Sequence, residues 1–264
     1  MVARAAGLSV LVVTSCGVAA QEPAATADPD GYLRHSSALA LYVSKGFYGQ
    51  ELPTYVRYLP YTHEVSIPGW RFKASLPALE IDGPGNVLVE IGSVGRESTS
   101  LVAERGVGDV VLSGTYELPA LGNGLPFFDI TLDLKLPTAD ESRGLGTGRP
   151  DVGIQLDAYQ TLGALTLFGS VGYRYRHRSP VFEGLNDSAS LSLGISLPLS
   201  DRWQSGVIYD FRQAASAFSG ETHEVLPYLS WAPTDQWSLM CYVVKGFTED
   251  SADRAAGIQL TRRW

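Results

Sequence analysis

Phe128-Asp-Ile-Thr-Leu-Asp-Leu-Lys-Leu136 alternates large apolar residues with polar or charged residues over its whole length. A period of two is typical of a β-strand, in which successive side chains point to opposite faces. The strand therefore has one apolar face and one polar face. In a soluble sandwich the apolar face would pack into a core, whereas in a transmembrane barrel it would face lipid and the charged face would line a wet lumen. The rest of the sequence is needed to choose between these two arrangements.

Similar alternating segments recur along the chain and predict a series of strands. We predict twelve, at about 38–49, 54–66, 71–82, 107–118, 127–137, 151–162, 165–176, 188–199, 203–213, 222–233, 236–247 and 254–264. Most have the length of about 9–11 residues with which a tilted strand crosses the hydrocarbon core. Pro60, Pro77 and Pro227 count against the stretches that contain them, because a proline cannot donate a hydrogen bond to its neighbour strand.

The predicted connections differ in length in a regular way. From 83–106 onward, longer connections alternate with short ones such as 163–164 and 200–202. Outer-membrane barrels have this parity, with long external loops and tight periplasmic turns, and an even number of strands. The short connection 50–53 is the exception, since the parity would place it outside. We therefore predict an all-β fold, a transmembrane antiparallel up-and-down β-barrel of about twelve strands.

Aromatic residues gather near the ends of the predicted strands, mostly with the apolar parity. Strand propensity explains their presence in strands but not their position at strand ends. Two aromatic girdles at the membrane interfaces explain both. The predicted interface aromatics are Tyr116, Phe128, Tyr173, Tyr175, Trp203, Tyr209, Trp231, Trp237 and Trp264.

The residues of opposite parity are predicted to face the lumen. They mix acids, bases and amides, and a charge is tolerable there if it is solvated or paired, whereas on the lipid face it would be costly. The candidates are Asp109, Asp129, Asp133, Lys135, Gln155, Asp157, Arg174, Arg176, Asp210, Arg212, Gln259 and Arg263. For each of them a structural hydrogen-bond network is the alternative to direct contact with a solute.

The N-terminus has the pattern of an export signal. A cationic start at Met1-Val-Ala-Arg4 precedes an apolar run and the small residues Val18-Ala19-Ala20. This predicts a signal peptide over 1–20, a flexible segment over 21–37 and a barrel domain over 38–264. The alternative is a lipoprotein signal that would lipidate Cys16.

Composition excludes several other classes of protein. The formal net charge of −8 disfavours nucleic acid as a partner, because nucleic-acid binding needs basic patches. His35, His63 and His223 are scattered without metal-ligand spacing, so we expect no metal site and no cofactor. A lipid hydrolase is an enzymatic alternative, because His177 and Ser179 form a His-x-Ser pair in which the His could activate the Ser hydroxyl. The pair lies in a predicted loop and Pro180 follows it, so we expect no enzymatic activity.

Several motifs resemble a family of proteobacterial outer-membrane proteins, the putative transporters of the phenol-degradation meta-pathway type. They include Arg57-Tyr-Leu-Pro60, Gly106-Val-Gly-Asp109, Leu134-Lys-Leu-Pro-Thr-Ala-Asp140 and Gly144-Leu-Gly-Thr-Gly148. The resemblance covers about residues 38–264 and implies an outer-membrane barrel that passes small or hydrophobic molecules. The terminal Trp264 also resembles the C-terminal aromatic signal read by the barrel-assembly machinery.

Taken together, these patterns predict a passive channel or transporter for small molecules, hydrophobic or aromatic ones among the candidates. We expect it in the bacterial outer membrane, with membrane lipids, the assembly machinery and a small-molecule solute as partners. A non-conducting structural or surface-interaction barrel is the second hypothesis, and the lipid hydrolase is the third.

Overall fold

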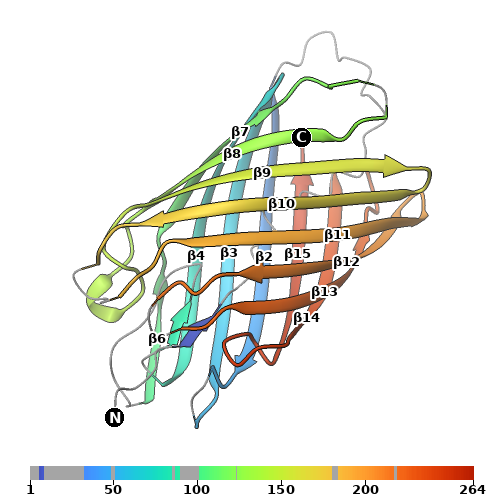
Figure 1. Ribbon diagram of the computed structural model, residues 1–264. Helices are drawn as coiled ribbons and strands as arrows, with labels where there is room; N and C mark the ends of the chain where they lie inside the picture. The colour runs from blue at the N-terminus through green and yellow to red at the C-terminus, as the bar shows by residue number, and fades with distance from the viewer. Residues whose placement is uncertain are drawn as a thin grey trace.

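The computed structural model describes residues 6–8, 33–48, 51–84, 87–89, 101–122, 124–179, 184–216 and 219–264, which form a β-barrel (Figure 1). Its strands are β2 (Arg34–Gly46), β3 (Thr54–Ile67), β4 (Trp70–Pro84), β6 (Leu101–Val107), β7 (Val110–Glu117), β8 (Phe127–Leu136), β9 (Asp151–Leu162), β10 (Leu165–Arg176), β11 (Ser188–Ser200), β12 (Trp203–Arg212), β13 (Thr222–Trp231), β14 (Trp237–Gly246) and β15 (Arg254–Arg263). A separate parallel pair joins β1 (Ala6–Leu8) to β5 (Val87–Val89). In the described part of the chain, no helix is long and apolar enough to cross a membrane.

Antiparallel pairing runs around the whole sheet and closes it. β2 pairs with β3 on one side and with β15 on the other, so the first and last barrel strands are neighbours. β4 pairs with β7 near its start and with β6 near its end, which makes β6 and β7 two halves of one strand. The barrel is therefore twelve-stranded, and the predicted fold class is confirmed.

The break between β6 and β7 falls at Gly108 and Asp109. A side chain at Gly108 would lie 2.8 Å from Leu79 Cδ2 and 3.0 Å from Pro77 Cγ. Gly108 still donates to the carbonyl of Pro77 at 2.9 Å, so the backbone passes close to β4 without a regular ladder. A glycine is needed for this close approach.

Among the predicted boundaries, two differ most from the structure. The first barrel strand begins at Arg34 rather than at 38, because Ser36 and Ser37 pair with Arg263 and Arg262 of β15. The end of the segment predicted as flexible, 21–37, therefore belongs to the barrel. The connection predicted over 83–106 is also shorter, since β4 continues to Pro84 and β6 begins at 101. The predicted signal peptide lies outside the described residues except for β1.

The three prolines that counted against their strands lie inside strands. Pro60 of β3 is directly opposite Pro77 of β4. The pairing of β3 with β2 is interrupted at Pro60 and resumes at Tyr58. The pairing of β13 with β14 is likewise interrupted at Pro227 and resumes at Tyr228. The missing N–H is thus accommodated by a local gap in the ladder rather than by the end of the strand.

The two faces of each strand differ in the sense expected of a membrane barrel. In β8, Ile130, Leu132 and Leu134 are exposed, whereas Asp129 and Lys135 are buried. A soluble sandwich would have the reverse pattern. Strand β8 therefore presents its apolar face to the outside and its charged face to the interior.

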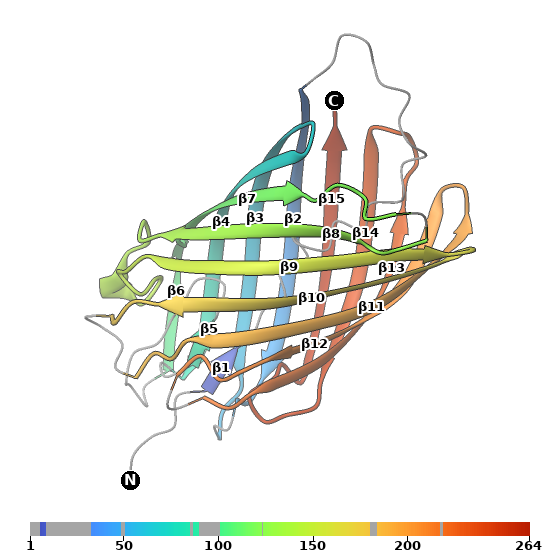
Figure 2. The ribbon, with the colours of Figure 1, turned by 45° about the horizontal axis from the view of Figure 1, so that its top comes forward.

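The two ends of the barrel differ in their connections. We call one the tight-turn end, which carries the connections 68–69, 163–164 and 201–202, the start of β2 and the end of β15. We call the other the long-loop end, which carries 137–150, 177–187, 213–221 and 247–253. The front strands β8 to β12 cross the back strands β2 to β4 in projection, which shows the tilt of strands around a barrel axis (Figure 2).

Candidate functional site

The interior of the barrel is the candidate site, and its two walls differ in chemistry. Strands β4 and β7 to β10 supply mainly charged and amide side chains. Strands β2, β3, β13 and β14 supply buried tyrosines. The four tyrosines are 1–7% exposed and comprise Tyr42, Tyr58, Tyr228 and Tyr242.

At the tight-turn end, Arg71 of β4 holds two acids together. Its Nε lies 3.2 Å from Oε1 of Glu117, and its Nη2 is paired with Asp129 Oδ2. Asp157, on the strand next to Asp129, accepts a 2.7 Å hydrogen bond from the side chain of Gln155. The polar wall here contains more acids than bases.

Farther along the same wall, hydrogen bonds between polar side chains link β7 to β8. Ser113 donates to Asp133 at 2.6 Å, and the hydroxyls of Thr115 and Thr131 are 2.9 Å apart. Each bond joins residues that are directly opposite in the β7–β8 register. The barrel register therefore fixes how the polar wall is connected.

At the long-loop end, Lys135 is the centre of a buried ion cluster. Its Nζ lies 2.6 Å from Asp151 Oδ2 and 3.4 Å from Asp109 Oδ2, and it donates to the Thr147 hydroxyl at 2.8 Å. The Lys135 and Asp151 side chains are each 4% exposed, and that of Asp109 is 0% exposed. We call these three charged residues the Lys135 cluster.

The connection 137–150 is folded against the interior wall by this cluster. Ala139 N–H donates to Asp109 at 3.0 Å, and Leu145 is only 1% exposed. Arg143 reaches Glu104 of β6 at 2.8 Å. The motifs Lys-Leu-Pro-Thr and Gly-Leu-Gly-Thr-Gly thus build a fastened loop at this end.

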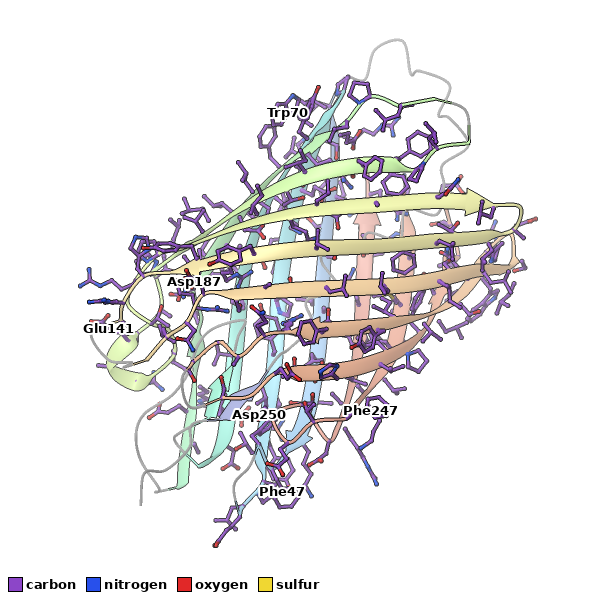
Figure 3. The ribbon with its side chains drawn as sticks, viewed as in Figure 1. Phe47, Trp70, Glu141, Asp187, Phe247 and Asp250 are labelled. Carbon is purple, nitrogen blue, oxygen red and sulfur yellow. The ribbon has the colours of Figure 1, made fainter. Side chains whose placement is uncertain are left out.

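A short 3₁₀ turn, η1 (Glu141–Arg143), lies on the outside of that loop (Figure 3, where Glu141 is labelled). Asp140 caps it by accepting bonds of 2.6 Å from the Ser142 hydroxyl and 3.0 Å from its N–H. The bond from the Ser142 hydroxyl lowers the pKa of the Asp140 carboxyl, because it favours the charged form. The turn therefore keeps an ionised cap at neutral pH.

The other predicted lumen residues do not form one cluster, and each makes its own contacts. Arg176 is buried and donates to the Asn186 carbonyl and to the Ser188 hydroxyl. Arg212 pairs with buried Asp210 at 3.0 Å. Gln259 donates to Thr261, whereas Arg263 is exposed at the tight-turn end. Arg174 is partly buried beside the serines of β11.

Most of the predicted interface aromatics are exposed on the outer surface. Tyr116, Tyr173, Tyr175, Trp203, Trp231, Trp237 and Trp264 are exposed, and Phe128 and Tyr209 are partly so. Trp203 stacks on Trp231 at 5.6 Å, and Trp237 and Trp264 flank the Arg262 guanidinium at 5.5 and 5.3 Å. These contacts place aromatic rings at the tight-turn end.

The interior tyrosines were not among the predicted lumen residues. Tyr42 has the parity of Ser44, and Tyr58 has that of Thr54 and Thr62. If every residue had been assigned to a face from the alternation along its strand, these tyrosines would have been predicted to face inward. Tyr242 and Tyr228 lie over Gly257 and Gly206 of the next strands, where a side chain would clash with the rings.

The structure does not bring His177 and Ser179 together as a catalytic pair. His177 Nδ1 lies 2.8 Å from the carbonyl of Pro150, and the Ser179 hydroxyl donates to the carbonyl of Thr147 at 2.6 Å. Both side chains thus fasten the connection 137–150 to the start of the next loop. A nucleophile would need its base within hydrogen-bond reach.

We therefore expect neither the parent protein nor Ser179→Ala to hydrolyse phospholipid faster than the uncatalysed reaction. Fatty-acid release from mixed micelles by the purified, folded barrel measures this directly. Release by the parent protein that disappears in Ser179→Ala, but persists in an Arg178→Ala control, would restore the hydrolase hypothesis.

Among the described residues, no group of three or more His, Cys, Asp or Glu side chains is arranged to hold a metal ion. The arrangement consists instead of a closed barrel, an apolar outer surface, and an interior with a mainly charged wall and a wall that carries the four tyrosines. This architecture is that of a transmembrane β-barrel of the outer-membrane type.

Comparison with known proteins agrees with this class. Residues 50–264 match the family described as "Putative MetA-pathway of phenol degradation", and the chain belongs to that family. No curated protein sequence matches the chain significantly. An outer membrane channel from Pseudomonas putida F1 has a similar fold, with a TM-score of 0.65 at 14% identity over 90% of this chain and 99% of the other. The KdgM porin has a TM-score of 0.51 at 10% identity, over 87% and 98% of the two chains.

Proposed function

We propose that this chain is a passive outer-membrane channel for small molecules, with hydrophobic or aromatic solutes as the favoured class. The observation that carries the proposal is the divided interior, in which most charged groups lie on the side of β4 and β7 to β10 and the four tyrosines lie on β2, β3, β13 and β14. Family membership and the barrel fold support a channel. The N-terminal export pattern supports the outer membrane as its location.

The tyrosine wall supports the choice of solute class. Tyr42 and Tyr242 are stacked with ring centroids 6.5 Å apart, and both rings are nearly fully buried. Aromatic solutes gain from offset or edge contacts with such rings. The charged wall opposite offers hydrogen bonds to a phenolic or carboxylate group on the same solute.

The direct test uses the purified barrel in planar bilayers and in vesicles. We expect discrete conductance steps, and faster uptake of a phenolic solute than of a sugar of similar mass. Folded protein that neither conducts nor accelerates uptake would favour the non-conducting alternative. The fastened connection 137–150, with buried Leu145, is the observation that favours that alternative.

Tyr58→Ala is expected to raise single-channel conductance and to weaken the preference for aromatic solutes. Tyr58 faces the interior and is 3% exposed, so its removal opens space in the packed interior and takes one ring out of the tyrosine wall. Tyr61→Ala, on the same strand but facing outward and 47% exposed, is the matched control. Equal effects of the two substitutions would show that the tyrosine wall does not control passage.

A further inference from the structure

Three cations lie side by side on the outer surface at the long-loop end. They are Lys245 of β14, Arg254 of β15 and Lys45 of β2, on consecutive strands. Arg254 is directly opposite Lys45, and the pair Val244 and Ala255 places Lys245 beside Arg254. We call these three residues the basic row.

The basic row belongs to the lipid-facing surface rather than to the lumen. All three side chains are exposed, as are Val43 and Val243 two positions farther along the same strands. The residues between them point inward and are buried, among them Ser44 and Val244. Adjacent strands are about 4.8 Å apart, so the row spans about 10 Å.

Aromatic side chains frame the row. Lys45 Nζ lies 5.9 Å from the ring centroid of Phe47 and 5.5 Å from that of Tyr55. Phe47, Tyr55 and Phe247 are 44%, 48% and 66% exposed. Phe47 and Phe247 are labelled at the same end of the barrel, opposite Trp70 (Figure 3). Such rings lie at the level of lipid headgroups, which sets the depth of the row.

The protein's own acids compensate this row only in part. Lys245 donates to the backbone carbonyl of Asp253 at 3.2 Å, and the carboxylate of Asp253 accepts from the N–H of Phe47. By contrast, Arg57 on the same surface has its own partner, Glu80, at 2.9 Å. Like charges on directly opposite strand positions repel each other, so the Arg254–Lys45 pair favours an anion from outside.

We propose that the basic row binds the phosphate groups of an anionic glycolipid in the outer leaflet. Arg254 can bind one phosphate in bidentate geometry, and the two lysines supply point charges on either side. The acyl chains would then lie on the apolar surface formed by Val43, Val243 and Ile258. The proposal rests on the outer-membrane location proposed above and is independent of what the lumen conducts.

The test measures the apparent unfolding temperature of the full-length barrel in detergent while lipopolysaccharide is added. Lipopolysaccharide should protect the parent, whereas phosphatidylcholine and inorganic phosphate should not. The double variant K45Q/R254Q should lose about thirtyfold in apparent affinity, given the usual contribution of each basic residue near an anionic surface. R262Q, which removes an outward arginine at the opposite end, should bind like the parent.

A second readout separates binding from folding. Without lipopolysaccharide, K45Q/R254Q should be at least as stable as the parent, because the substitution removes a like-charge repulsion. If the double variant does not fold, K45Q alone is measured in the same way and should lose about fivefold in affinity. Undiminished binding by the variants overturns the proposal, as does equal protection by inorganic phosphate or phosphatidylcholine. Loss of conductance with intact lipopolysaccharide binding would count only against the channel.

Discussion

Lys135→Met is expected to lower the free energy of unfolding by about 3–5 kcal/mol, because it leaves buried carboxylates without their cation. Asp151 and Asp109 both depend on Lys135 Nζ, at 2.6 and 3.4 Å, and neither side chain is more than 4% exposed. Methionine has a similar length, so the loss reflects charge rather than volume. Urea unfolding of the barrel in lipid vesicles, followed by gel mobility without heating, measures the change.

The same substitution should also release the connection 137–150. Lys135 donates to Thr147, and Asp109 holds the N–H of Ala139, so the cluster fastens both ends of the loop. We expect faster proteolysis near Arg143 and a change in conductance noise.

Neutralising the acids provides the control for this prediction. Adding Asp109→Asn and Asp151→Asn to Lys135→Met removes the unpaired charges and should recover most of the lost stability. If the triple variant is as unstable as Lys135→Met alone, packing rather than charge would account for the loss.

Leu132→Arg is expected to prevent most of the protein from assembling, whereas Asp133→Arg should be tolerated far better. Leu132 lies in the middle of β8, faces outward and is 57% exposed. An arginine on the lipid face at the bilayer midplane destabilises a barrel by about 2–4 kcal/mol. Asp133 faces the interior, where it accepts from Ser113, and there an arginine can be solvated or paired.

Folding yield into vesicles of fixed thickness measures this difference. Leu132→Ala controls for the loss of the leucine itself, and Asp133→Asn controls for the loss of the carboxylate. Similar yields for both arginine variants would contradict the assignment of the two faces of β8.

Much of the fold could be predicted because alternation is a local property. The pattern of Phe128 to Leu136 depends only on side chains pointing to opposite faces, and the number of strands follows from repeating that pattern. Boundaries were less accurate where alternation fades, as in Arg34–Ser37, which is held in the barrel by pairing with β3 and β15. The fold class could be predicted, whereas closure of the ladder appears only in three dimensions.

For the candidate site, the sequence could predict which kinds of residue face the interior but not which of them are in contact. Sequence parity placed Asp109 and Lys135 on the lumen face, but Asp151 was not among the predicted lumen residues. Nothing local in the sequence shows that these three residues meet around one nitrogen atom. The interior tyrosines were not predicted because the lumen candidates were taken from charged and amide residues alone. The basic row likewise combines residues from three strands that are far apart in the chain.

The sequence by itself thus determined which side chains share a face, because that depends on neighbours along one strand. The tertiary structure decided which side chains meet, because contacts between strands depend on register, closure and the way loops fold back. In a closed barrel these are set by the hydrogen-bond ladder as a whole, and no single segment contains that information.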